Sequence, residues 1–171
     1  MNTVNMIECS FEKHASQILN IFNHAILHST ALYEYEERSL NDVKHWFENK
    51  ALHHFPVIGI ENEHGILMGF ASYGTFRNFP ANLYTVEHSV YVDQSYRGKG
   101  LAIQLIQALM QKAKQQGMHT MIGGIDASNV ASIALHKKLG FTHAGTLSEV
   151  GFKFGRWLDL AFYQKILNDQ N

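Results

Sequence analysis

Two periods of apolar and polar residues follow one another between residues 85 and 116. From Val86 to Val92 successive side chains alternate between two sets, which predicts a β-strand with both faces in use. From Leu101 to Met110 apolar residues recur at helical spacing, with glutamine and lysine on the other side, which predicts an amphipathic helix. Gly98 and Gly100 stand between the two. The segment is therefore predicted to form a strand, a tight glycine loop and a helix.

The residues before this segment predict one strand, two helices and a hairpin. Ser39 and Asp42 form a capping pattern ahead of the second helix. Two apolar runs separated by residues 62–65 predict the hairpin, and residues 74–84 form the longest irregular stretch. The predicted elements are a strand at Asn5 to Cys9, a helix from about His14 to near Ser29, a second helix after Ser39, and strands at Phe55 to Glu61 and Ile66 to Tyr73.

The residues after 116 predict three further strands and one short helix. Gly117 ends the long helix and Gly140 the short one, because glycine accepts the left-handed backbone of a helix C-terminus. Ser128 and Asn129 are of the types that cap a helix N-terminus. Strands are predicted at residues 119–125, 141–150 and 156–166. The order βααβββαβαββ, without repeat or linker, predicts one mixed α/β domain over residues 1–171.

Composition excludes several classes of protein. The 171 residues carry a formal net charge of −1, which gives no electrostatic reason to expect nucleic acid or an anionic membrane as partner. No stretch reads as a signal peptide or membrane span, so we expect a cytoplasmic protein. The single cysteine, Cys9, has no disulfide partner and is predicted to be a buried structural thiol. The eleven histidines form no ligand-like array, and no metal is predicted.

The glycine loop has two interpretations. A helix that opens on bare backbone amides attracts anions, because its first N–H groups are unpaired and its dipole is positive there. A Gly-x-Gly before a helix is also often a simple turn. It is not a nucleotide-binding loop of the Walker type, since Lys99 is followed by Gly100 and not by serine or threonine. The residues alone leave both interpretations open.

The pattern Arg97-x-x-Gly100-x-Ala102 resembles the acetyl-CoA signature Q/R-x-x-G-x-G/A of the GCN5-related N-acetyltransferases. The resemblance extends over nearly the whole chain and narrows to the phosphinothricin and methionine sulfoximine N-acetyltransferases. It implies a mixed, mostly antiparallel twisted sheet with a splayed strand pair, flanked by helices, and a homodimer. The blocks that carry it are IFNHAILHSTALYEYE, GFASYGTFRNF, TVEHSVYV, GIDASNVASIALHKKLGF and VGFKFGRWLDL.

The resemblance also implies which residues bind acetyl-CoA. One strand would leave its backbone free for the pantetheine arm, the glycine loop would wrap the pyrophosphate, and no metal would be needed. For Asn129 a helix cap is an equally good role and is compatible with coenzyme contact. For Lys138 the alternative is a solvated lysine at a helix end. The implied set is Val90, Tyr91, Val92, Arg97, Gly98, Lys99, Gly100, Leu101, Ala102, Ile103, Asn129 and Lys138.

Acetyl transfer to an amine needs a base, because an ammonium has no lone pair and an α-amino group with a pKa of ~8 is mostly protonated at neutral pH. Glu87 on the central strand is the candidate, with a solvent-facing carboxylate as the alternative role and His88, on the opposite face, as its competitor. Many family members place a proton-donating tyrosine where this chain has His136. That departure leaves the general acid open between His136, a hydroxyl such as Tyr91, and no acid at all.

The predicted acceptor is a small amino-acid analogue such as phosphinothricin, methionine sulfoximine or methionine sulfone, attacked directly without a cysteine intermediate. Arg77 is of interest because arginine binds carboxylates and phosphinates with a planar fork. Lys153 and Arg156 are candidates to contribute across a dimer interface. A broader L-amino-acid or antibiotic acetyltransferase and a non-catalytic CoA-binding sensor are the alternatives. The resemblance implies that Tyr33, Arg77, Asn78, Phe79, Glu87, His88 and Ser89 line the substrate pocket.

Overall fold

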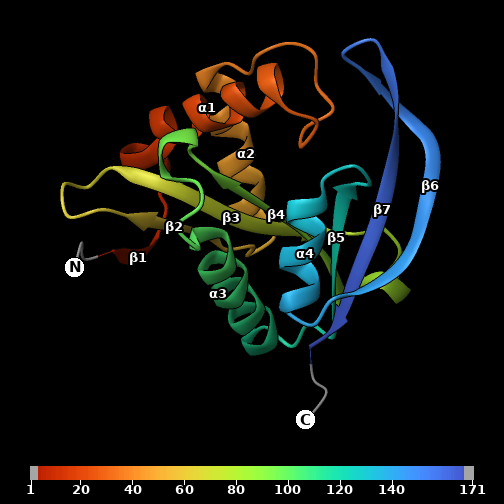
Figure 1. Cartoon of the computed structure of the whole chain (residues 1–171). Helices are drawn as coiled ribbons and strands as arrows, with labels where there is room; N and C mark the ends of the chain where they lie inside the picture. The colour runs from red at the N-terminus through yellow and green to blue at the C-terminus, as the bar shows by residue number, and fades with distance from the viewer. Residues whose placement is uncertain (1–3, 168–171) are drawn as a thin grey trace.

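The computed structural model describes residues 4–167 and contains the eleven helices and strands in the predicted order (Figure 1). Two short 3₁₀ turns, Pro80–Asn82 and Gln94–Tyr96, lie in the loops around the fourth strand. The elements are β1 Asn5–Glu8, α1 Phe11–His28, α2 Leu40–Leu52, β2 Val57–Glu61, β3 Leu67–Thr75, β4 Thr85–Val92, α3 Leu101–Gln115, β5 Thr120–Asp126, α4 Val130–Lys138, β6 Thr142–Lys153 and β7 Arg156–Ile166.

Helix starts follow their capping residues. Ser39 and Asp42 form the predicted capping box of α2, each side chain accepting from the other residue's backbone N–H. The α1 helix begins at Phe11, three residues before the predicted start, because Ser10 is its N-cap and accepts from the Lys13 N–H. None of the described helices is long and apolar enough to cross a membrane.

Seven strands form one sheet in the order β1-β2-β3-β4-β5-β7-β6, and every neighbouring pair is antiparallel except β4 and β5. Helices α1 and α2 cover one face and α3 and α4 the other (Figure 1). Alternation along β2 shows the division, since Val57 packs under α1 and Ile58 packs with the α3 core. This is the mixed, mostly antiparallel sheet that the sequence resemblance predicted.

The parallel pair β4 and β5 separates halfway along its length. Pairing runs from Thr85 opposite Thr120 to His88 opposite Gly123 and then stops. Beyond that point β4 stays paired with β3 as far as Val92, while β5 stays paired with β7 as far as Asp126. The second half of β4 therefore has no neighbour on its β5 side. The predicted splayed pair is confirmed.

Cys9 is buried at the end of β1, as predicted. A Cβ built on Gly59 would lie 2.6 Å from its sulfur, so glycine at that position makes room for the thiol. Burial, together with the charges of Glu61 and Glu8, raises the pKa of the thiol to about 12. Cys9 is thus an uncharged packing residue and no nucleophile.

Candidate active site

A cavity of about 300 Å³ lies where β4 and β5 separate. Its walls come from the loop after α1, from residues 87–91 of β4, from the end of β5, from α4 and from Leu160 of β7. Eight of the residues predicted from the sequence line it together: Tyr33, Glu87, His88, Ser89, Val90, Tyr91, Asn129 and His136. Segments up to a hundred residues apart in the sequence therefore meet in one place.

Glu87 is half-buried in this cavity. Its carboxylate lies against β5, where a Cβ on Gly124 would be 3.1 Å from Oε1. Burial raises the pKa of Glu87 above its ordinary value. Within the described part of the chain no hydrogen bond or ion pair engages this carboxylate. A desolvated, unpartnered carboxylate beside the splayed strands has the properties of a general base.

His88 lies on the opposite face of β4 from Glu87, as the alternation predicted. Its ring is stacked on His136 of α4, with centroids 5.0 Å apart, and both rings meet Phe141 edge-on. The two Nε2 atoms are 3.0 Å apart, and His136 Nδ1 is 2.7 Å from the carbonyl oxygen of Ser132. A carbonyl only accepts, so the neutral His136 carries its proton on Nδ1 and accepts the His88 Nε2–H at its own Nε2.

Burial keeps both histidines neutral. It lowers the pKa of His88 to about 3, helped by electrostatic repulsion between the two rings when both would be protonated, and it also lowers the pKa of His136. His88 Nδ1 is then a buried acceptor without a partner among the described residues. The one N–H of neutral His136 donates a hydrogen bond to the Ser132 carbonyl. His136 could therefore protonate a leaving group only in its cationic form, which burial disfavours. The catalytic role of His136 stays a prediction.

Asp126 is a lining residue that the sequence reasoning missed. It ends β5, and its carboxylate accepts from the Ser128 N–H and hydroxyl, both at 2.8 Å, and from the Thr30 hydroxyl. Arg156 Nη2 lies 3.6 Å away. Burial alone would raise the pKa of Asp126, but these hydrogen bonds and the Arg156 charge lower it below its usual value. The available signal was an acid at the end of a predicted strand, next to capping residues.

Two roles were considered for Asn129, a helix cap and a contact with the coenzyme, and the structure shows the first. It is the N-cap of α4, and its side-chain oxygen accepts from the Ser132 N–H at 3.1 Å. It also lines the cavity, so its amide group lies where a ligand between β4 and β5 would pass. The cap is confirmed, and contact with the coenzyme stays a prediction.

The glycine loop opens α3 without a side-chain cap. Gly98 and Gly100 have φ values of +76° and +74°, a left-handed backbone that favours glycine, and Gly100 is the N-cap. A Cβ at either position would meet nothing within 4 Å, so the space above the loop is open. The Arg97 Nε–H donates to the Val92 carbonyl at 3.3 Å and joins the loop to the end of β4. This arrangement suits an anionic ligand, because the first amides of α3 are accessible.

The other predicted coenzyme residues surround the same helix or lie on α4. Leu101 is buried in the core under α3, and Ala102 and Ile103 are half-buried in its first turn. Lys99 is exposed, with its ammonium 5.1 Å from the centre of the Tyr96 ring. Lys138 is exposed in the last turn of α4. Their contacts with the coenzyme stay predictions.

Three predicted acceptor residues do not line the cavity. Arg77, Asn78 and Phe79 are exposed in the loop between β3 and β4, where the Arg77 guanidinium lies 5.1 Å over the Phe79 ring. Their role stays a prediction. The expectation that Lys153 reaches another subunit is wrong, because this lysine is buried in its own chain and its ammonium donates to three backbone carbonyls.

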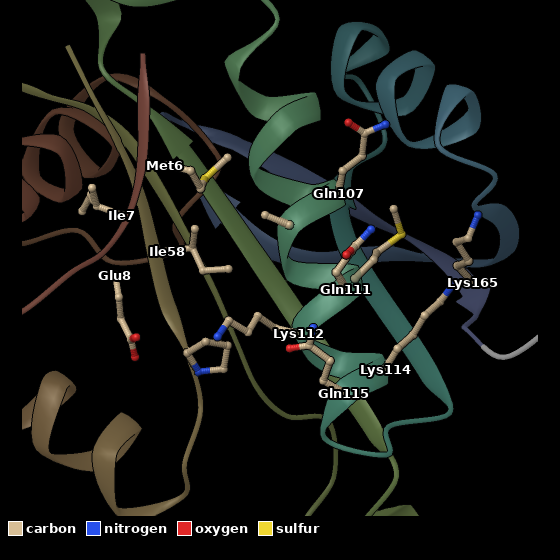
Figure 2. A pocket seen from close by; sticks show the side chains of 13 residues that line it. Met6, Ile7, Glu8, Ile58, Gln107, Gln111, Lys112, Lys114, Gln115 and Lys165 are labelled. Carbon is tan, nitrogen blue, oxygen red and sulfur yellow. The ribbon is translucent and has the colours of Figure 1, made fainter. Parts of the chain in front are cut away.

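A larger depression, of about 1120 Å³, lies elsewhere, between β1, β2 and α3. In Figure 2 Met6 and Ile58 face the Gln107, Gln111 and Lys112 side chains of α3 across it. It contains none of the predicted site residues and lies away from the separated ends of β4 and β5. This depression has the larger volume. The half of β4 without a β5 neighbour and the half-buried Glu87 are in the smaller cavity, which we therefore take as the candidate active site. In the described part of the chain no group of three or more potential metal ligands is found.

Comparisons with known proteins agree with this geometry. Residues 18–141 match the family described as Acetyltransferase (GNAT) family. The L-methionine sulfoximine/L-methionine sulfone acetyltransferase of Pseudomonas aeruginosa is 45% identical over 147 residues, which is 86% of each chain. The L-amino acid N-acyltransferase MnaT of Escherichia coli is 40% identical over 153 residues, 90% of this chain and 88% of that protein.

A solved structure extends the agreement to three dimensions. The protein yncA of Salmonella typhimurium, solved with its cofactor acetyl-CoA, superposes with a TM-score of 0.94 at 39% identity and covers 99% of this chain and 96% of its own. The splayed strands and the open glycine turn are thus found in a chain whose sequence and fold both match known acetyltransferases. The protein belongs to the acetyltransferase (GNAT) family, as the sequence resemblance predicted.

Proposed function

We propose that this enzyme transfers the acetyl group of acetyl-CoA to the α-amine of a small amino-acid-like acceptor, with methionine sulfoximine and methionine sulfone as the first candidates. The observation that carries the proposal is Glu87, a half-buried and unpartnered carboxylate in the cavity between the separated strands. The Pseudomonas aeruginosa relative, named for these two acceptors, supports the choice. The Salmonella typhimurium structure with acetyl-CoA supports the acyl donor.

The residues fit the donor without a metal. The free side of β4 beyond His88 offers backbone groups to the pantetheine arm, and the uncapped start of α3 offers N–H groups to the pyrophosphate. We expect a backbone N–H near Val90 to polarise the thioester carbonyl. These contacts use the main chain, which explains why the side chains in the glycine loop carry little chemistry of their own.

The reaction follows from these positions. Glu87 takes a proton from the acceptor ammonium, directly or through water, and frees the lone pair of the nitrogen. The amine then attacks the thioester carbon, a C–N bond forms, and the C–S bond breaks so that CoA leaves as thiolate. The nitrogen gives up its second proton to water as the tetrahedral intermediate collapses. No enzyme residue forms a covalent bond with the acetyl group, in accord with the uncharged, buried Cys9.

A homodimer is part of the proposal. The β6–β7 hairpin exposes a row of large apolar side chains, of which Trp157 is 60% exposed, and a surface of this kind marks an interaction site. The row consists of Leu147, Val150, Phe152, Phe154 and Trp157. We propose that two copies of the chain cover this hairpin in the dimer, and that the enzyme acts in the cytoplasm.

The experiment that tests the proposal is an acceptor screen. Free CoA thiol is measured with acetyl-CoA and methionine sulfoximine, methionine sulfone, phosphinothricin or ordinary L-amino acids. We expect the largest kcat/KM with the first two. A higher value with ordinary amino acids would favour the broader N-acyltransferase that the Escherichia coli relative suggests. Binding of acetyl-CoA without thiol release for any amine would indicate a sensor.

A further inference from the structure

The loop that follows α1 forms one wall of the active-site cavity without regular structure of its own. Residues Thr30 to Tyr33 line the cavity opposite β4, and the segment from Ser29 to Tyr35, which we name the acceptor loop, contains neither helix nor strand. Apart from the Ser29 N–H bond to the Ala25 carbonyl, no N–H group of this loop donates to a backbone carbonyl among the described residues, and the Ala31 N–H donates to the Ser29 hydroxyl at 3.2 Å. The loop therefore relies on contacts with other parts of the chain for its shape.

Lys153, the last residue of β6, provides the central support. It is 4% exposed, and its ammonium donates to the carbonyl oxygens of Ile26 at 2.6 Å, Ser29 at 2.9 Å and Leu32 at 2.7 Å. An ammonium has three N–H donors, so all of them are used. Two of the acceptors belong to the last turn and C-cap of α1, where carbonyls lack helical partners and the dipole favours a cation. Leu32, like Ser29, belongs to the acceptor loop.

Further contacts hold the same loop from the same side. The Tyr33 ring packs on Gly151 of β6, where an added Cβ would lie 2.8 Å from Tyr33 Cε2. The Tyr35 hydroxyl donates to the Phe152 carbonyl, and Thr30 donates to Asp126. In Figure 1 the loop after α1, drawn in orange, lies beside the upper part of the β6–β7 hairpin. The hairpin thus fixes the acceptor loop at several points.

We propose that Lys153 is a positioning residue that holds the acceptor loop opposite Glu87 and thereby determines how the amine acceptor binds. The inference rests on the proposed function, because it assigns the cavity wall to the acceptor. It does not extend to the donor, since the glycine loop and the start of α3 make no contact with Lys153. Loss of Lys153 should therefore raise the KM of the acceptor and leave the KM of acetyl-CoA unchanged.

The main test compares Lys153→Met with Lys165→Met. Lys165 lies on β7 and donates to the Leu139 carbonyl at the end of α4, so it is a lysine of the same kind at a place remote from the acceptor loop. For Lys153→Met we expect the KM of methionine sulfone to rise on the order of 10–100-fold, with the KM of acetyl-CoA unchanged. Hydrogen exchange of the amides from Ser29 to Tyr35 should become faster. Lys165→Met should change none of these.

A second pair of variants guards against a Lys153 variant that fails to fold. Gly151→Ala leaves all charges in place and pushes a methyl group against Tyr33, whereas Gly145→Ala, also on β6, places its methyl group in open space. Neither glycine has a positive φ, so alanine fits both backbones. We expect the acceptor KM to rise for Gly151→Ala alone.

Three outcomes would overturn the proposal: a folded Lys153→Met with protected loop amides, an unchanged acceptor KM, or an equal rise in both KM values. The exchange measurement does not depend on activity. If wild-type enzyme acetylates no amine, the proposed function fails, while faster exchange in Lys153→Met alone would still show that Lys153 holds the loop.

Discussion

Glu87 shows how one strand position acquires a chemical role from its surroundings. Its neighbour His88 is the other titratable group at this point of β4, but its ring packs against His136 and Phe141 and is neutral, with a pKa of about 3. Glu87 keeps a free carboxylate whose pKa is raised by burial. The structure therefore favours Glu87 over His88 as the base, and the reason is the face of the strand on which each lies.

The first prediction concerns Glu87→Gln, which keeps the shape and removes the basicity. We expect kcat to fall by about 10²–10⁴-fold at neutral pH with acetyl-CoA affinity preserved. The loss should shrink as pH rises and the acceptor becomes a free amine. A pH series of kcat measures this, and a uniform loss at every pH would show that Glu87 only positions the acceptor.

The stability of the same variant has a definite sign. Because the pKa of Glu87 is raised in the folded protein, the folded state retains this proton where the unfolded chain has lost it, and stability falls as pH rises through that pKa. Glu87→Gln removes this titration. The free energy of unfolding of the variant minus that of the wild type should therefore increase as pH rises from ~4 to ~7. Urea unfolding of both proteins at several pH values measures this difference.

At the scale of elements, two adjacent glycines of β5 contact different titratable side chains of the site. A Cβ on Gly123 would lie 2.9 Å from His88 Nε2 and 3.1 Å from His136 Nε2, whereas a Cβ on Gly124 would lie 3.1 Å from the Glu87 carboxylate. Successive residues of a strand face opposite sides, so one glycine makes room for the histidine pair and the other for Glu87.

The second prediction follows from these contacts. Gly123→Ala should lower the free energy of unfolding by about 1–3 kcal/mol, because it overpacks a buried hydrogen-bonded pair. Gly124→Ala should lower kcat with a smaller effect on stability, since the half-buried Glu87 side chain can shift. Chemical denaturation and steady-state kinetics of both variants test this, and equal effects on stability would contradict it.

The third prediction concerns the start of α3. Gly100→Ala and Gly117→Ala both place alanine at a positive φ, +74° and +77°, with open space around the Cβ. Both should lose about 1–2 kcal/mol of stability to backbone strain. Only Gly100→Ala, at the proposed pyrophosphate site, should raise the KM of acetyl-CoA. If the two variants had a similar KM for acetyl-CoA, the glycine loop would not be part of the coenzyme site.

At the scale of the whole molecule, the β6–β7 hairpin has two roles in the proposals. Its inner side holds the acceptor loop through Lys153, and its outer side carries the exposed apolar row. The pairing of β6 with β7 shifts register between Leu147 and Gly151, and Gly151 follows this irregularity and packs against Tyr33. Dimer formation and acceptor binding would therefore depend on the same hairpin.

The fourth prediction tests the dimer. Wild-type protein should sediment at twice the 19.4 kDa of one chain, and Trp157→Glu should sediment at the mass of a single chain, because a charge in an apolar interface is left unpaired. Tyr84→Glu is the control, since Tyr84 is equally exposed, at 60%, but lies in the loop before β4. A Trp157→Glu protein that remains dimeric would place the interface elsewhere.

From the sequence we could predict the order of helices and strands, the capping of α2, the burial of Cys9 and the family. These depend on local periodicity, on residues a few positions apart and on motif spacing, all of which are read along the chain. The same alternation that separated Glu87 from His88 on β4 needed no tertiary information.

The sequence did not show which of the candidate residues meet, because that depends on the three-dimensional fold. The fold joined Glu87, Asn129 and His136 in one cavity, left Arg77 outside it and added Asp126, which no motif marked. It also turned Lys153 from a candidate for another subunit into an internal support. The reason is physical: hydrogen-bond partners such as the Lys153 ammonium and the Leu32 carbonyl are 121 residues apart, and their meeting depends on how the sheet brings β6 to the end of α1.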